Sequence, residues 1–182
     1  EDLLGGTVDY IGFSYYMSFA IDSHRENNPH FDYLETEDLV KNNYVQASEW
    51  EWQIDPEGLR YALNWFTDHY HLPLFIVENG LGAPDVVETD GSIKDDYRIE
   101  FISDHLVWLL KAIEEGCNCI GYMLWAFTDN VSPQNAFKNR YGLVEIDLED
   151  NRNRRLKKSA YFYKEIIEKR SFEIETDEEV YK

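Results

Sequence analysis

"LPLFIVENG" (residues 72–80) is the stretch from which the rest of the chain can be interpreted. Its apolar run, 74–77, is typical of a strand buried on both faces, and the chain then breaks at Asn79-Gly80. Glu78 stands at the end of this run, where a carboxylate is costly unless it has partners. Two interpretations stay open: a functional carboxylate at a strand's C-terminal end, or one that caps a turn or pairs with a buried arginine.

Two more apolar runs, "DYIGFSYY" (9–16) and "CIGYMLWAF" (119–127), predict further strands, and helical patterns lie between the three. The first helix is expected to begin with Asp55 as N-cap and Pro56 at the first helical position, and the second to end at Gly116. The expected buried stripes are Leu59, Leu63 and Phe66 on the first helix, and Ile99, Ile102, Leu106, Leu109 and Ile113 on the second.

A hairpin within 141–156 and a last helix near 157–169 complete the pattern. Alternating strands and helices predict a parallel α/β fold. Long loops, 17–54 and 80–94, follow the strands' C-terminal ends, where (β/α)8 barrels build their active sites. Three strand–helix units are too few to close a barrel, so we expect the C-terminal part of a larger structure.

Composition excludes several classes of partner. The formal net charge is −19 with no basic patch, which argues against nucleic acid and anionic membranes. Cys117 and Cys119 are separated by a single residue, a spacing that favours reduced thiols in a cytoplasmic protein over a zinc or redox pair. The five histidines show no metal-ligand spacing, and we expect no metal or cofactor.

Aromatic side chains gather at the predicted strand ends. Tyr15 and Tyr16 follow the first strand, and Trp125 follows the third. A tyrosine hydroxyl can hold a carboxylate, and an indole can form the floor under a sugar ring, although a single aromatic residue is more often part of a core. Trp50 and Trp52, in the long loop, either line the same site or pin the loop.

At this point the sequence resembles a known family. "IVENG" (76–80) resembles the nucleophile motif of glycoside hydrolase family 1, the retaining β-glycosidases, and "GYMLWAFTDNVSPQNAFKNRYGLVEIDLE" (121–149) is similar to that family's last strand and the loop beyond it. "DYIGFSYYMS" (9–18) and "SEWEWQIDPEGLRYAL" (48–63) are similar to stretches of the bacterial 6-phospho-β-glucosidases.

The resemblance implies the C-terminal portion, about strands six to eight, of a (β/α)8 TIM barrel. Residues 1–172 would belong to the barrel, and 173–182 would form an acidic tail. It also implies that Glu78 is the nucleophile, that Tyr16 hydrogen-bonds this carboxylate and keeps it ionised and oriented, and that Trp125 bounds the sugar site.

For the phosphate, the resemblance points to Ser132, Lys138 and Tyr141. Relatives that act on unphosphorylated glucosides usually carry a Glu at the position of Ser132, which would repel a 6-phosphate. The family's phosphate-binding Lys sits two residues before the Tyr, but that position is Asn139 here. Lys138 or Arg140 could substitute, and Lys138 as a solvent-facing loop charge is the remaining alternative.

The family's acid/base Glu lies in a Glu-Pro motif that this sequence lacks, so we expect the chain alone to be inactive and to self-associate through exposed sheet edges. The expected activity of the intact enzyme is retaining hydrolysis of β-linked 6-phospho-glucosides, such as cellobiose 6-phosphate or aryl glucosides, in the cytoplasm of a bacterium. Alternatives are a β-glucosidase or 6-phospho-β-galactosidase on the same fold, or a non-catalytic module for sugar-phosphate binding or assembly.

Overall fold

The computed structural model describes residues 6–21, 39–49, 51–131 and 136–173. Its centre is a parallel sheet in the order β1-β6-β7, with β1 at Ile11–Ser14, β6 at Leu74–Asn79 and β7 at Cys119–Leu124. The helices are α2 (Pro56–Tyr70), α3 (Asp96–Glu114) and α4 (Lys158–Lys169). The short strands are β2 (Ala20–Ile21), β3 (Leu39–Val40), β4 (Gln46–Ala47), β5 (Gln53–Ile54), β8 (Val144–Ile146) and β9 (Arg154–Leu156).

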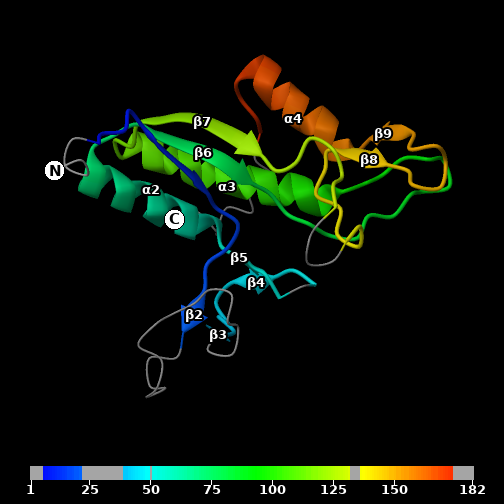
Figure 1. The fold of residues 1–182 in the computed structure, drawn as a ribbon, viewed down its shortest axis with the longest axis horizontal. Coiled ribbons are helices and arrows are strands. Elements are labelled where there is room, and N and C mark those ends of the chain that lie inside the picture. The colour runs from blue at the N-terminus through cyan, green and yellow to red at the C-terminus, as the bar shows by residue number, and fades with distance from the viewer. Residues whose placement is uncertain (1–5, 22–38, 50, 132–135, 174–182) are drawn as a thin grey trace.

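The core lies between the sheet and helices α2 and α3; in Figure 1, α3 runs behind the strands. Leu74 and Ile76 of β6 are fully buried against Leu59 and Leu63 of α2 and against Ile102 of α3. Each such side chain contributes roughly 1.5–3 kcal/mol of transfer free energy when it leaves water.

The opposite face of the sheet is less covered than the apolar runs predict. Val77 is 37% exposed and Met123 is 54% exposed. Within the described residues of this chain the 74–77 strand is therefore buried on one face, and the predicted burial of the face that carries Val77 is not seen.

The start of α2 follows the sequence signals closely. The Asp55 side chain accepts a hydrogen bond from the backbone N–H of Gly58 at 2.9 Å, and Pro56 is the first helical residue. The helix ends at His71, whose left-handed φ of 52° lets its N–H bond the Thr67 carbonyl. The N-cap prediction is confirmed.

Helix α3 buries Ile102, Leu106 and Leu109 of the predicted stripe, but its buried face is wider than that stripe. Ile113 is 41% exposed, so its assignment to the buried stripe is wrong. The buried side instead includes Arg98, His105 and Ala112. Hydrophobic periodicity does not anticipate the burial of Arg98 and His105, because both are polar and find hydrogen-bonding partners inside the fold.

The predicted hairpin and last helix are confirmed. β8 and β9 pair antiparallel, with Glu145 opposite Arg155, and α4 begins two residues after β9. Gly116 has a φ of 110° at the end of α3, a conformation that few residues other than glycine adopt. No helix within the described ranges is long and apolar enough to cross a membrane.

Candidate active site

The side chain of Glu78 lies at the C-terminal end of β6, beside the end of β1. Ser14 pairs with Glu78 in the sheet register, after an irregularity between Phe13 and Ser14. The backbone N–H of Tyr15 donates to the Glu78 carbonyl at 2.9 Å, so β1 stays attached to β6 one residue past its own end. This attachment brings the side chains at positions 14 and 16 to the same place as the carboxylate.

Two hydroxyl groups donate to one oxygen of that carboxylate. The Tyr16 hydroxyl lies 2.8 Å from Glu78 Oε2, and the Ser14 hydroxyl lies 3.1 Å from the same atom. Among the described residues Oε1 receives no hydrogen bond. The two hydroxyls therefore orient the carboxylate through Oε2, and Oε1 is free of hydrogen bonds from the described residues.

Tyr16 is suited to act as a permanent donor. Burial raises its pKa above the ordinary tyrosine value, and the hydrogen bond to Glu78, the charge of Glu78 and the nearby Tyr141 raise that pKa further. Its phenol therefore stays protonated at neutral pH. The predicted contact between Tyr16 and Glu78 is present.

Ser14 is a site residue that sequence reasoning passed over. The family resemblance sets Ser14 where the phospho-specific relatives often have Ser, but its contact with Glu78 becomes evident only from the register that sets the two residues opposite each other. Tyr15, by contrast, turns away from the site: its hydroxyl donates to the Asp55 carbonyl at 2.7 Å, at the start of α2.

Asn79 connects the three strand ends. It is fully buried, its Nδ2 donates to the Tyr15 carbonyl at 2.7 Å, and its Oδ1 accepts from the Tyr122 hydroxyl at 2.5 Å. Its backbone carbonyl also accepts from the N–H of Trp125 at 2.8 Å. The sequence indicates only a turn residue here, whereas the structure shows a polar link from β6 to both of its neighbours.

Trp125 lies directly beside the turn after Glu78. The Trp125 carbonyl stands 1.9 Å from the point where a Cβ would be built on Gly80, so only glycine fits at position 80. The Trp125–Ala126 peptide bond is cis. The indole is 37% exposed, in keeping with a surface that could meet a ligand, and its role as a sugar-binding residue stays a prediction.

Trp52 reaches the site from the loop before α2. Its ring meets the Tyr16 ring edge-on, with centroids 6.1 Å apart. A tight turn positions it: the Ser48 N–H donates to the Trp52 carbonyl at 2.9 Å, and Glu51 adopts a φ of 62°. Trp52 therefore packs against the ring of the tyrosine that holds Glu78, while Trp50 lies outside the described residues.

Two of the candidate phosphate ligands, Tyr141 and Lys138, differ in burial. Tyr141 is buried, and its ring lies 2.3 Å from the point where a Cβ would be built on Gly82. It is near enough to Tyr16 to raise that residue's pKa. Lys138 is exposed, and Ser132 lies outside the described residues. The structure thus places Tyr141 near Tyr16 and Lys138 at the surface of the same loop.

Arg140 is committed to structural contacts. Its Nη1 lies 3.6 Å from Asp129 Oδ2 and donates to the Ile146 carbonyl at 3.4 Å, and its guanidinium lies over the Phe137 ring. Asn139, beside it, is buried with no partner for its Oδ1 among the described residues. Of the two cations considered for the phosphate, Lys138 is the one whose side chain faces solvent.

Comparison with known proteins gives consistent matches. Residues 1–172 match the family model described as glycosyl hydrolase family 1. A phospho-cellobiase of Klebsiella oxytoca is 48% identical over 168 residues, which are 88% of this chain and 36% of that protein. A 6-phospho-beta-glucosidase of Dickeya chrysanthemi is 46% identical over 171 residues, or 90% of this chain and 36% of that protein.

Solved structures agree with the sequence matches. The family 1 β-glucosidase from Thermotoga maritima superposes with a TM-score of 0.80 at 27% identity, over 92% of this chain and 36% of that one. Its complex with castanospermine gives a TM-score of 0.80 at 28% identity. The chain therefore spans little more than a third, 36%, of the proteins it matches.

Proposed function

The chain belongs to glycosyl hydrolase family 1, and from this premise we propose that the intact protein is a retaining 6-phospho-β-glucosidase with Glu78 as its nucleophile. The observation that carries the proposal is the pair of hydroxyls, from Tyr16 and Ser14, on a single oxygen of a carboxylate at a strand's C-terminal end. The three parallel strands and their helices form part of the family's (β/α)8 barrel, as the sequence predicts.

In the proposed reaction, Glu78 Oε1 attacks the anomeric carbon as the glycosidic C–O bond breaks, and the leaving oxygen takes a proton from a second carboxyl group. Water then hydrolyses the covalent glycosyl-enzyme, and the same second group acts as base. The two carboxyl groups of a retaining enzyme stand about 5–5.5 Å apart. We assign the second one to the part of the intact protein that lies outside this chain.

The substrate class follows from the relatives. The proteins at 46–48% identity carry the names phospho-cellobiase and 6-phospho-beta-glucosidase, whereas the β-glucosidase of solved structure is 27% identical. A phosphomonoester carries about −1.5 to −2 charges at pH 7 and needs cationic and hydroxyl donors. We propose Lys138, Tyr141 and Ser132 for this task, and Trp125 as a surface under the sugar ring.

The compartment follows from the chemistry of the substrate. A charged sugar phosphate does not cross a lipid bilayer unaided, so we propose that the enzyme works in the bacterial cytoplasm, where uptake coupled to phosphorylation delivers it. The relatives named above come from bacteria.

The direct test is Glu78→Gln in the full-length protein. We expect kcat on an aryl 6-phospho-β-glucoside to fall at least about 1,000-fold, because the amide cannot form the glycosyl-enzyme. Glu88→Gln is the matched control, since Glu88 is an exposed residue of the loop that follows Glu78, and it should retain wild-type rates.

A mechanism-based 2-fluoro substrate should label the wild-type peptide that contains Glu78, as read by mass spectrometry. Undiminished activity in Glu78→Gln, or a label on another residue, would contradict the assignment. Saturable binding of sugar phosphates with no turnover by the full-length protein would instead favour the binding-module alternative.

A further inference from the structure

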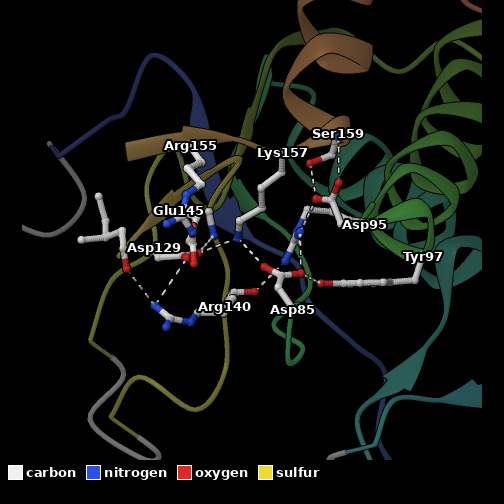
Figure 2. Close-up of polar contacts among 12 residues, drawn as sticks. Asp85, Asp95, Tyr97, Asp129, Arg140, Glu145, Arg155, Lys157 and Ser159 are labelled. Atoms are coloured by element: carbon white, nitrogen blue, oxygen red, sulfur yellow. Dashed lines mark hydrogen bonds and ion pairs between the residues drawn. The ribbon is translucent and has the colours of Figure 1, made fainter. Parts of the chain in front are cut away.

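A group of buried charges lies beside the candidate site and takes no part in the chemistry proposed above. It consists of three carboxylates and three cations, called here the buried ionic cluster: Asp85, Asp95, Asp129, Arg98, Arg140 and Lys157. Five of these side chains are at most 4% exposed, and Arg140 is 22% exposed. Figure 2 shows them converging from separate segments of the chain.

Lys157 is the link between two loops. Its Nζ lies 2.6 Å from Asp85 Oδ2 and 2.7 Å from Asp129 Oδ1, and Figure 2 shows it pointing between the two carboxylates. Asp85 belongs to the loop after β6, the strand that ends with Glu78 and Asn79, and Asp129 belongs to the loop after β7. One ammonium group from the start of α4 therefore ties the two loops together.

Arg98 anchors the same loops to helix α3. Its Nη1 pairs with Asp95 and lies 3.5 Å from Asp85 Oδ1, while its Nη2 donates to the Arg140 carbonyl at 2.6 Å. Asp95 in turn accepts from the backbone N–H of Ser159 at 2.8 Å, at the start of α4. The cluster thus connects both loops to both helices.

The backbone on either side of Tyr141 is held by members of this cluster. The Arg140 carbonyl accepts the bond from Arg98, and the Gly142 N–H donates to Asp129 Oδ1 at 2.9 Å. The Tyr141 carbonyl accepts from the Ala126 N–H at 3.0 Å. The position of Tyr141 relative to Glu78 therefore depends on two charged side chains that do not approach the nucleophile in the described structure.

Stability alone does not account for so many buried charges. Replacement of a buried ion pair by apolar residues of similar volume is often neutral or stabilising, since desolvation offsets much of the attraction. Because charge pairs are directional, they fix the relative position of two loops better than apolar packing does. A misplacement of about 1 Å at an active site can cost on the order of 100-fold in rate.

We infer that the buried ionic cluster is a positioning device, in which Lys157 and Asp129 set Tyr141 and its loop against the strand end that carries Glu78. On this view the two residues govern the preference for a phosphorylated sugar without touching it. The inference rests on the proposed function, because it assigns the loop that holds Tyr141 to the phosphate.

Asp129→Asn in the full-length protein is the first test. The amide keeps an acceptor for the Gly142 N–H but removes the charge that faces Lys157. The readout is the ratio of kcat/KM for an aryl 6-phospho-β-glucoside to kcat/KM for the plain aryl glucoside. We expect this ratio to fall about tenfold or more, because the misplaced loop penalises the substrate that carries the phosphate.

Glu145→Gln is the matched control. Glu145 is also buried, and it pairs with Arg155 within the β8–β9 hairpin, at 2.8 Å. Its loss should lower Tm and leave the ratio of kcat/KM values unchanged, since a general loss of stability affects both substrates alike. An Asp129→Asn enzyme with a lower Tm and an unchanged ratio would overturn the positioning role.

Lys157→Arg keeps the test decisive if Asp129→Asn does not fold. It retains the charge but alters the reach between Asp85 and Asp129, and the ratio should again fall, whereas an unchanged ratio would overturn the inference. A wild-type enzyme with no preference for the phosphorylated substrate would overturn the proposed function itself. Selectivity that survives in these variants overturns only the positioning role.

Discussion

Glu78 and Asp129 are both carboxylates that follow strands of the same sheet, and their surroundings differ completely. Glu78 is held by two neutral hydroxyls on one oxygen, and no cation pairs with it among the described residues. Asp129 is fully buried, pairs with Lys157 and also accepts a backbone N–H. Neutral donors orient a carboxylate while leaving its charge available, whereas a buried counter-ion neutralises it. The first arrangement suits a nucleophile and the second suits a structural link.

We expect the largest effect on stability from removal of the Lys157 side chain, the ammonium group of the buried ionic cluster. Lys157→Ala leaves Asp85 and Asp129 buried without their ammonium partner, so we expect the free energy of unfolding to fall by about 3–5 kcal/mol. Lys158→Ala is the control, because the adjacent Lys158 forms only a surface pair with Asp96 and should change stability by less than about 1 kcal/mol. Denaturant unfolding of the full-length protein measures both. Equal losses of unfolding free energy in the two variants would show that the buried pairs and the surface pair contribute alike to stability.

His105 tests how a buried titratable group behaves when it forms no ion pair with the described residues. It is fully buried on α3, its Nδ1 lies 2.8 Å from the Phe101 carbonyl, and burial lowers its pKa from 6.5 to about 4. Because the unfolded chain binds a proton more readily, stability should be complete above pH 6.5 and decline as the pH falls toward 4. The loss attributable to this residue should be about 3 kcal/mol.

The measurement is Tm against pH for the wild type and for His105→Met. The variant should lose less stability than the wild type between pH 6.5 and 4, because its side chain does not titrate. Parallel curves would show that another group is responsible for the acid sensitivity.

Removing one neutral donor should produce the smallest of the three effects, and it should appear in catalysis rather than in stability. Tyr16→Phe deletes the hydroxyl 2.8 Å from Glu78 Oε2, and we expect kcat to fall about 100-fold. Tyr15→Phe removes a hydroxyl that bonds the Asp55 carbonyl instead, at a cost of about 1 kcal/mol in stability with kcat retained. If the two variants reduced kcat equally, Tyr16 would have no special role at the nucleophile.

Local sequence patterns are sufficient to predict the helices and the main strands. The strand that ends at Glu78, the N-cap at Asp55 and the hairpin before α4 were all predicted, since each depends on neighbouring residues along the chain. The contact between Tyr16 and Glu78 was also predicted, from a family resemblance rather than from spacing. Ser14 and Asn79 were not recognised as site residues, because their roles depend on strand register.

By itself the sequence determined where strands and helices begin and end, which carboxylate stands at a strand end, and which family the chain resembles. Only the tertiary structure decided which polar residues are buried together: Lys157 meets Asp129 across 28 residues, and Arg98 meets the Arg140 carbonyl across 42. The physical reason is that apolar burial leaves a periodic signal along the chain. A buried charge leaves none, because its stability depends on a partner that only folding brings within hydrogen-bonding distance.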